Sequence, residues 1–319
     1  MKNPVRTTTK EVVRGARSVV INKTPIVEIA KNLARKSTSL PVWPKEMHLE
    51  TKNEKKLLTY LIVLDSLNFC FWSKKKKWGI RYKNKFYNGY FALSLALKKF
   101  FEKSPNKANF EYFSKISFPE FKKILTGDGR LELLEKRYNI LKAVSRVFIK
   151  KYQGDPRKFV LAAKGRAEKL VWKIARELPS FNDFVRYTNK KVYFLKRAQI
   201  LVGDIWGAFG GKGIGNLSNM DYLTAFSDYK LPQILSHFGV LEYDRKLEEK
   251  IKKRIIIKAG SKEEIEIRSA TIWAVEYLKE KIEKEGRKIL SFQVDWLLWN
   301  LSQKIRMENP YHLARTIFY

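Results

Sequence analysis

Apolar residues recur at helical spacing in segment after segment of this chain, and this periodicity constrains the fold more than any other feature. Gly, Pro and Ser/Thr breaks separate the segments, as at the turn sequences 126–130 and 154–156. Only the stretch 78–87 alternates apolar and polar residues as a short hairpin does. No internal repeat or low-complexity linker is present. We therefore expect a mainly α, helical bundle-like fold with at most a small β ribbon. Residues 1–319 are expected to form a single domain, with room for two closely packed helical lobes.

Composition limits where such a chain can work. Of its 319 residues, 45% are hydrophobic, which is enough for a sizeable core. No run of 18 apolar residues is present, so no membrane span is expected. The basic N-terminal residues lack the apolar segment of a secretory signal. The single cysteine, Cys70, rules out an intramolecular disulfide and is consistent with a reducing cytoplasm. We therefore expect a cytoplasmic protein.

The net charge is +33, from 65 Lys and Arg against 32 Asp and Glu. Such a charge favours encounters with nucleic acid or phosphorylated ligands. A lysine-rich surface is also common in heat-adapted proteins, so both explanations stay open. The histidines His48, His237 and His312, with one cysteine, do not form a zinc pattern. We expect neither a metal nor a redox cofactor.

The segment 207–215, GAFGGKGIG, is rich in glycine and lies between two expected helices. Its spacing does not match a Walker A loop, and no parallel-sheet pattern surrounds it as in a dinucleotide-binding fold. Three interpretations remain open. The segment could be a nest of backbone N–H groups for a phosphate, the hairpin of a helix–hairpin–helix element, or a plain tight turn.

Acidic residues follow the glycine segment. Asp221 and Asp228 are seven residues apart and would share one face if helices expected at 220–226 and 232–238 were continuous. Asp228 lies just before the second helix, where an aspartate is a good N-cap. It could equally be a carboxylate that faces a cavity and stabilises an oxocarbenium-like sugar or activates a water. Both interpretations of Asp228, as a helix cap and as a catalytic carboxylate, stay open.

The helix before the glycine segment carries two more candidates. Lys196 and Asp204 are eight residues apart, so both can face one cleft. Asp204 is flanked by apolar residues and is expected to be at least partly buried, where it needs a partner or a raised pKa. At the end of an apolar helix expected over 57–72, the sequence NFCFW could stack on a planar base or simply pack in the core.

Several blocks of the sequence, in order from about residue 67 to residue 319, together resemble the queuosine salvage protein family. The most specific are KRAQILVGDIWGAFGGKGIG, MDYLTAFSDYKLPQILSHFGVL and PYHLARTIFY. The resemblance implies hydrolysis of the N-glycosidic bond of queuosine 5′-phosphate, which releases the base queuine for reuse in tRNA modification. It also implies an all-helical fold related to helix–hairpin–helix DNA glycosylases.

In that comparison Asp228 falls where the glycosylases have their catalytic aspartate. Lys196 falls near a lysine that some of them use as a nucleophile; a hydrolase needs none, so Lys196 is assigned to substrate or phosphate contact. The resemblance further implies a base and ribose pocket, for which the candidates are His48, Phe69, Trp72, Phe181, Asp183, Asp204 and Tyr229.

The expected partner is therefore a small-molecule nucleotide, with nucleic acid possible but not required. Two rival functions remain. The net charge suggests a non-catalytic tRNA- or DNA-binding protein, with steeply salt-dependent binding. The glycine segment suggests a DNA base-excision glycosylase that flips its target base out of the duplex.

Overall fold

The computed structural model describes residues 3–35, 40 and 42–319. Within this part of the chain there are fourteen α-helices and eight short strands, which confirms the mainly α prediction. The helices are α1 (Pro4–Gly15), α2 (Thr24–Ala34), α3 (Glu54–Ser66), α4 (Gly89–Lys103), α5 (Phe110–Lys115), α6 (Phe118–Ile124), α7 (Leu134–Tyr152), α8 (Pro156–Leu161), α9 (Ala167–Glu177), α10 (Lys196–Ala208), α11 (Lys230–His237), α12 (Arg245–Lys252), α13 (Lys262–Lys284) and α14 (Ser291–Ser302). None of these helices is long and apolar enough to cross a membrane.

The strands form only two-stranded pairs in the described residues. They are β1 (Val19–Ile21), β2 (Gly79–Tyr82), β3 (Lys85–Asn88), β4 (Phe184–Tyr187), β5 (Lys190–Tyr193), β6 (Leu241–Tyr243), β7 (Ile256–Ile257) and β8 (Leu313–Ala314). The pairs β1–β6, β2–β3 and β4–β5 are antiparallel, and β7–β8 is parallel. The hairpin β2–β3 is the one that the alternation in 78–87 predicted.

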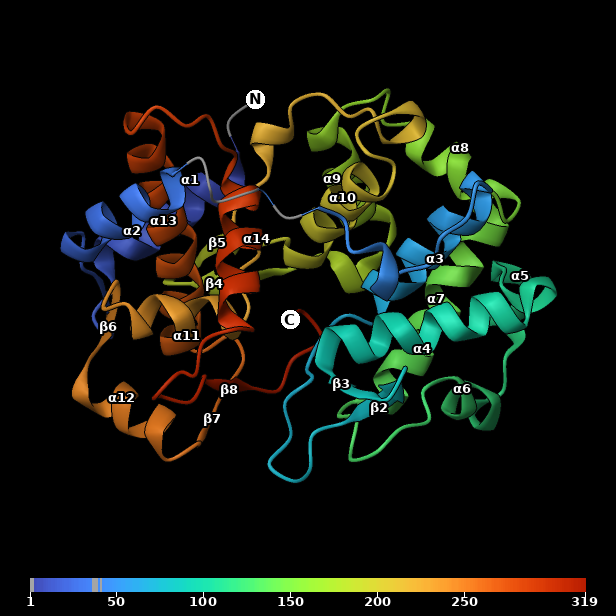
Figure 1. The fold of residues 1–319 in the computed structure, drawn as a ribbon, viewed down its shortest axis with the longest axis horizontal. Helices are drawn as coiled ribbons and strands as arrows, with labels where there is room; N and C mark the ends of the chain where they lie inside the picture. The colour runs from blue at the N-terminus through green and yellow to red at the C-terminus, as the bar shows by residue number, and fades with distance from the viewer. Residues whose placement is uncertain (1–2, 36–39, 41) are drawn as a thin grey trace.

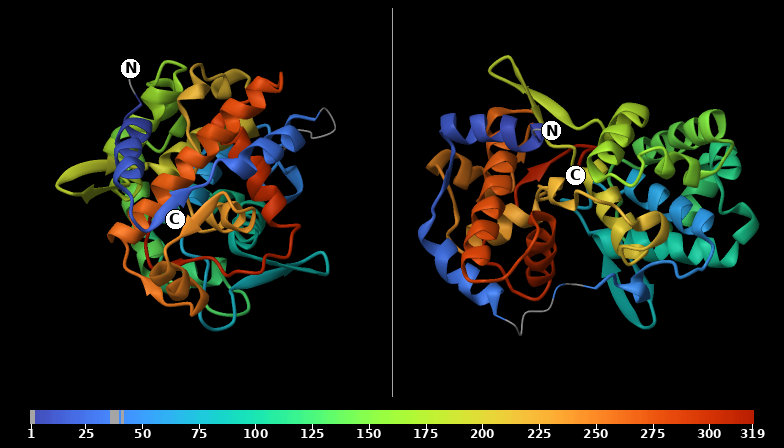
Figure 2. Two further views of the ribbon diagram at one scale, coloured as in Figure 1. Left: turned by 90° about the vertical axis from the view of Figure 1, so that its left-hand side faces the viewer. Right: turned by 90° about the horizontal axis from the view of Figure 1, so that it is seen from above.

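Two groups of helices lie side by side (Figures 1 and 2). Helices α1 and α2 pack with α13, and α11, α13 and α14 pack together. The second group contains α3 to α10, with α10 against α3 and α9, and α7 against α5. Buried apolar side chains from both groups belong to one continuous cluster. The arrangement of one domain with two lobes stays a prediction.

Helix α3 ends at Ser66, six residues before the expected end at Trp72. The reason is that buried guanidinium groups bind the backbone carbonyls that a longer helix would use. Arg197 donates to the carbonyls of residues 65 and 66 at 3.1 and 2.7 Å. Arg137 donates to the carbonyls of residues 67, 69 and 70. The chain then turns through Cys70, which has a φ of 48°.

The glycine segment ends α10 rather than forming a separate element. Gly211, with a φ of +68°, donates its N–H to the carbonyl of Trp206 at 2.8 Å, as expected for a left-handed residue after a helix. A short 3-10 helix, η4 (Gly213–Gly215), follows. The segment does not line the cavity described below, so it supports the interpretation as a turn.

The helix expected over 220–226 is wrong, because only the 3-10 helix η5 (Met220–Tyr222) forms there. Side chains of two neighbouring helices bind the next backbone amides. Thr224 N donates to Gln199 Oε1 at 2.8 Å, and Phe226 N donates to Asp295 Oδ2 at 2.6 Å. Asp221 therefore lies in η5 and Asp228 in an extended loop, so the two do not share a helix face.

An ion pair buried in the core ties α13 to the start of α10. Arg268 of α13 donates to both carboxylate oxygens of Asp183 at 3.1 and 2.6 Å, and both side chains are 1% exposed. Asp183 Oδ2 also accepts the N–H of Lys196, the first residue of α10, at 3.3 Å. One carboxylate thus fixes the helix that carries Lys196 and Asp204.

Replacing Asp183 by Ala should lower the free energy of unfolding by about 3–5 kcal/mol, because it leaves the Arg268 guanidinium buried without its bidentate partner. Chemical denaturation followed by circular dichroism measures the change. The control is Glu280→Ala on α13, the helix that carries Arg268. The ion pair of Glu280 with Lys284 is exposed and should contribute less than about 1 kcal/mol. Equal effects of the two substitutions would contradict this account of the core.

Candidate active site

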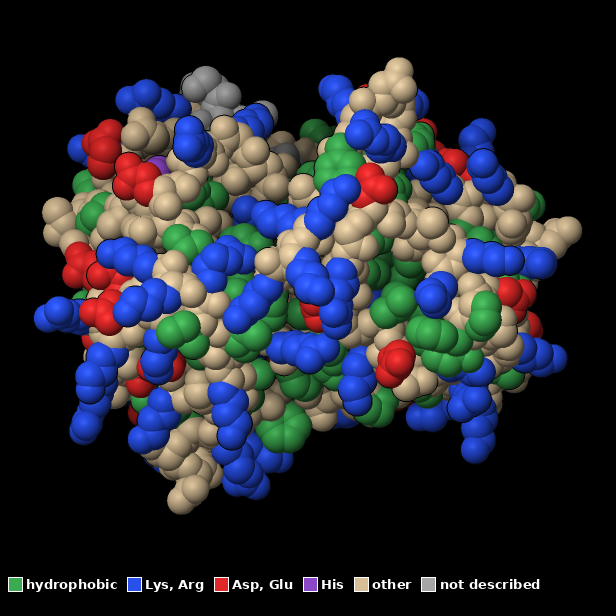
Figure 3. Space-filling model, turned by 90° about the horizontal axis from the view of Figure 1, so that it is seen from below, with side chains coloured by type: hydrophobic (Ala, Val, Ile, Leu, Met, Phe, Trp, Pro, Cys, Tyr) green, Lys and Arg blue, Asp and Glu red, His purple; other side chains and the backbone are tan. Residues whose placement is uncertain are grey.

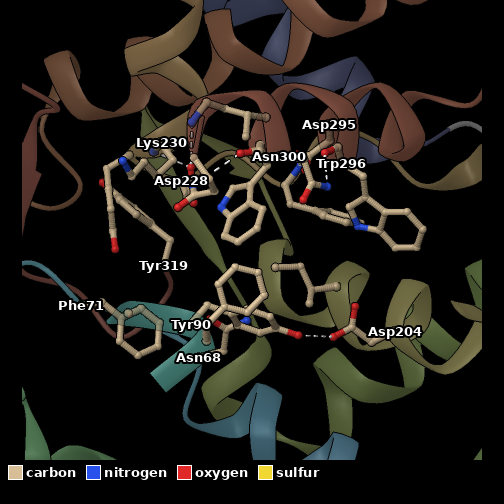
Figure 4. A pocket seen from close by; sticks show the side chains of 18 of the residues that line it. Asn68, Phe71, Tyr90, Asp204, Asp228, Lys230, Asp295, Trp296, Asn300 and Tyr319 are labelled. Carbon is tan, nitrogen blue, oxygen red and sulfur yellow. Dashed lines mark hydrogen bonds between the residues drawn. The ribbon is translucent and has the colours of Figure 1, made fainter. Parts of the chain in front are cut away.

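A cavity of about 250 Å³ lies between the two groups of helices (Figure 4). On one side its wall comes from the loop 42–48, the loop 68–71, the start of α4 and helix α10. On the other side the wall comes from residues 226–231, helix α14 and the tail residues Tyr311 and Tyr319. The cavity is therefore built from parts of the chain that are far apart in sequence.

Six of the nine predicted site residues line this cavity. They are His48, Phe69, Lys196, Asp204, Asp228 and Tyr229. The other three do not line it and are buried in the core. Trp72 donates its indole N–H to the carbonyl of Ala314 at 2.9 Å, Phe181 lies under the Arg197 guanidinium at 4.8 Å, and Asp183 pairs with Arg268.

Asp228 combines the two roles that its sequence position left open. Its Oδ1 accepts the backbone N–H groups of Lys230 and Leu231 at 2.6 and 3.0 Å, which caps the start of α11. Its Oδ2 makes no hydrogen bond with any described residue, and the side chain lines the cavity (Figure 4). The cap fixes the carboxylate in place and leaves one oxygen for a ligand.

Lys196 lies at the first position of α10 and is 5% exposed. Its ammonium group forms no ion pair with the described residues, although it faces the cavity. Burial lowers the pKa of Lys196, whereas the negative charges of Asp228 and Asp295 oppose that change. A buried cation without a partner is costly, so this position favours a ligand with an acceptor group.

Asp204 lines the cavity, and the charge of a second buried acid, Asp65 of α3, acts on it. Burial, followed by the nearby charge of Asp65, raises the pKa of Asp204 well above its usual range. Burial also raises the pKa of Asp65 to about 7, and Asp65 Oδ2 has no hydrogen-bond partner. Two buried carboxyl groups this close favour a shared state with less than two negative charges.

His48 is fully buried beside this pair. Its Nδ1 lies 2.9 Å from the carbonyl of Pro44, and its Nε2 lies 2.8 Å from the hydroxyl of Tyr90. Tyr90 in turn lies 3.3 Å from Asp204 Oδ2 (Figure 4). Burial lowers the pKa of His48 to about 4, so the imidazole is neutral at physiological pH.

Sequence reasoning missed the contribution of α14. Asp295, Trp296 and Trp299 all line the cavity from this helix. Burial raises the pKa of Asp295 to about 8, while its hydrogen bond from Phe226 N opposes the shift. The signal was available, since Asp295 is a carboxylate flanked by apolar residues, like Asp204.

Aromatic rings and cations complete the wall. Tyr90 and Trp299 meet edge to face with their ring centroids 6.1 Å apart, and Trp43 and Phe71 also line the cavity. Near the protein surface the Tyr311 ring lies within cation–π distance of three cations, at 5.6 Å from Lys77, 5.5 Å from Lys230 and 5.7 Å from Arg254. The cavity thus offers flat apolar faces inside and positive charge towards solvent.

No group of three or more His, Cys, Asp or Glu side chains suited to hold a metal ion occurs in residues 3–35, 40 and 42–319. The side chains that line the cavity supply carboxyl groups, a buried ammonium group and aromatic faces.

Comparison with known proteins gives this cavity a context. The family model described as queuosine salvage protein matches residues 47–319. The chain belongs to the queuosine salvage protein family. A relative from Sphaerobacter thermophilus is 39% identical over 316 residues, covering 99% of this chain and 97% of the relative. A relative from Bos taurus is 30% identical, with 98% of each chain covered. Both are named queuosine 5′-phosphate N-glycosylase/hydrolase, and all the cavity residues discussed above from His48 onward fall within the family match.

The raised pKa of Asp65 makes stability depend on pH. The folded carboxyl keeps its proton up to about pH 7, whereas in the unfolded chain it loses the proton near its usual pKa of 3.8. The contribution of Asp65 to the free energy of unfolding is therefore fully present below its pKa in the unfolded chain. This contribution is lost as the pH rises through its pKa in the folded protein. Asp65→Asn should raise the melting temperature by about 2 °C or more above that window and less below it.

Thermal melts at a series of pH values between about 5 and 8 measure this difference. The exposed Asp221→Asn is the matched control and should shift the melting temperature equally little at every pH. A stabilisation by Asp65→Asn that is the same at all pH values, or a loss of stability at the alkaline end, would contradict the assignment.

Proposed function

We propose that this chain hydrolyses the N-glycosidic bond of queuosine 5′-phosphate and releases queuine, which can be reused in tRNA modification. The names of its full-length relatives support the substrate. The volume and shape of the cavity support a single small ligand rather than a polymer. One observation carries the chemistry: a capped carboxylate, Asp228, keeps one oxygen free in a cavity with aromatic walls.

The reaction places opposite demands on the two halves of the substrate. As the bond from C1′ to the base breaks, positive charge develops on the ribose and the bonding electrons pass to the base. Asp228 Oδ2 stabilises that positive charge or orients the attacking water. Water adds its hydroxyl to C1′, and its other proton balances the charge on the released base. Water is the only co-reactant this requires, and we propose that no metal or redox cofactor takes part.

The remaining contacts divide between base and phosphate. The aromatic walls from Phe71, Tyr90 and Trp299 suit a planar base, since flat rings bury its faces. The cations Lys77 and Lys230 suit the 5′-phosphate because they line the cavity where it approaches solvent. Lys196 lies deeper, among carboxyl groups, and we assign it to contact with the sugar or phosphate oxygens.

We also propose that the protein works in the cytoplasm. Its cysteine, Cys70, is a free and buried thiol, which is the usual state of cysteine in a reducing compartment.

Asp228→Asn should keep the fold and reduce kcat by about 10²–10⁴-fold, since asparagine still caps a helix but carries no negative charge. Release of free base from the mononucleotide, followed by chromatography, measures the loss. The control is Asp244→Asn, which alters the cap of α12 in the same way and does not line the cavity. An Asp228→Asn variant with wild-type turnover would show that the catalyst is another group.

Lys230→Met should raise KM for the 5′-phosphate about tenfold or more, because a charge-assisted hydrogen bond contributes about 1.5–3 kcal/mol. The same substitution should change kcat/KM for the unphosphorylated nucleoside much less. Steady-state kinetics with both substrates measures the difference, and the exposed Lys284→Met is the control. Equal losses for nucleotide and nucleoside would remove Lys230 from the phosphate site.

Binding of nucleic acid is the second candidate function, and the surface charge favours it. Lys and Arg side chains cover much of the face shown in Figure 3 and outnumber the acidic side chains there. That function predicts binding to polynucleotide that weakens steeply with salt, together with no base release from a mononucleotide. The mononucleotide assay therefore separates the two candidates.

A further inference from the structure

A chain of hydrogen bonds runs from the Pro44 carbonyl through His48 and Tyr90 to Asp204. The donors and acceptors along it decide where each proton lies. The carbonyl of Pro44 can only accept, so the proton in its 2.9 Å contact with His48 is on Nδ1. In a neutral imidazole Nε2 then has no proton and accepts from the hydroxyl of Tyr90, 2.8 Å away. Tyr90 has a single hydroxyl proton, and this contact uses it.

The next contact in the chain must therefore take its proton from the other side. Tyr90 Oη lies 3.3 Å from Asp204 Oδ2. With the Tyr90 proton on the His48 side, a hydrogen bond across this contact needs a proton on the carboxyl group. We propose that Asp204 is held as a neutral carboxylic acid, with its proton on Oδ2, and that Oδ1 accepts a hydrogen bond from the substrate base.

The opposite direction would need an imidazolium at His48, which would donate to Tyr90 and leave Asp204 ionised. His48 is fully buried, burial lowers its pKa to about 4, and the nearby positive charge of Lys98 acts in the same sense. The groups that face Asp204 are Asp65 and Tyr60 from α3, Tyr90 from α4 and Lys196 from its own helix. Burial and the charge of Asp65 favour the neutral form of Asp204, whereas a hydrogen bond donated by Tyr90 and the charge of Lys196 would oppose it.

A neutral Asp204 matches the reaction, so this inference rests on the proposed function. Asp204 and Asp228 lie on opposite walls of the cavity (Figure 4). A carboxylate near the ribose stabilises the positive charge that develops there, whereas a second negative charge near the base would oppose the electrons that pass to the leaving group. A neutral acid avoids that repulsion.

The ligand chemistry follows from the free oxygen. The hydrogen bond of the Asp204 side chain within the described residues is made by Oδ2, and the side chain lines the cavity, so Oδ1 is left for a ligand. It suits an N–H donor on the edge of a guanine-like ring. Because its proton is committed to Tyr90, Asp204 positions the base and does not protonate it.

The test is Asp204→Asn, which reproduces the neutral acid: the amide N–H donates to Tyr90 and the amide oxygen accepts from the base. We expect kcat/KM at neutral pH within about tenfold of wild type, and a loss of about 10–100-fold in Asp204→Leu, which leaves polar partners unsatisfied. The wild-type rate should fall as the pH rises through the pKa of Asp204, and Asp204→Asn should lack that alkaline fall. A folded Asp204→Asn variant as inactive as Asp228→Asn would overturn the proposal.

An infrared difference spectrum between wild type and Asp204→Asn at neutral pH gives a readout that does not depend on turnover. The proposal requires that the wild type has a carbonyl band of a protonated carboxyl group that the variant lacks. A difference that shows only carboxylate bands overturns it. If that protonated band is present but wild type releases no base from the nucleotide, the proposed function fails and the protonation state stands.

Discussion

The cavity depends on two buried arginines that hold the loop after α3. Arg137 and Arg197 come from different helices, and between them they bind the backbone carbonyls of residues 65, 66, 67, 69 and 70. The Phe69 ring lies between their guanidinium groups, at 4.3 and 5.0 Å. Planar cations with several donors suit this task, because each satisfies several carbonyls that would otherwise be buried without partners. The result is an irregular loop, rigid enough to carry part of the cavity wall.

Buried acids in this protein are stabilised in two different ways. Asp183 is paired with Arg268, which donates a hydrogen bond to each of its carboxylate oxygens. Asp65, Asp204 and Asp295 lack such a partner, and burial raises the pKa of each. The first arrangement fixes a helix in the core. In the second, Asp204 and Asp295 line the cavity, and the charge of all three acids depends on their surroundings. An ion pair with an arginine thus distinguishes Asp183, which has a structural role, from the acids at or next to the candidate site.

Helical periodicity was sufficient to predict the class of fold, and the alternation in 78–87 predicted the β2–β3 hairpin, since both depend on local sequence. Six of the nine predicted site residues line the cavity, and their roles stay predictions. What the sequence did not reveal depends on distant partners. The end of α3 is set by Arg137 and Arg197, and the lost helix after Tyr222 by the side chains of Gln199 and Asp295. The direction of the Trp72 ring also depends on a distant partner, because its indole N–H binds the carbonyl of Ala314.

The tail that contains β8 has a consequence for how the protein is made. Tyr311 and Tyr319 line the same cavity as His48, and the backbone N–H of Cys70 binds the carbonyl oxygen of Tyr319 at 2.8 Å. During synthesis a ribosome releases residue 48 from its exit tunnel long before these tyrosines. The nascent chain can form its local helices early, but the cavity is complete only after the tail with Tyr311 and Tyr319 has been synthesised and has packed against it. Contacts of such long range are slow to form, so the growing chain exposes an unfinished, aromatic-lined pocket in the meantime.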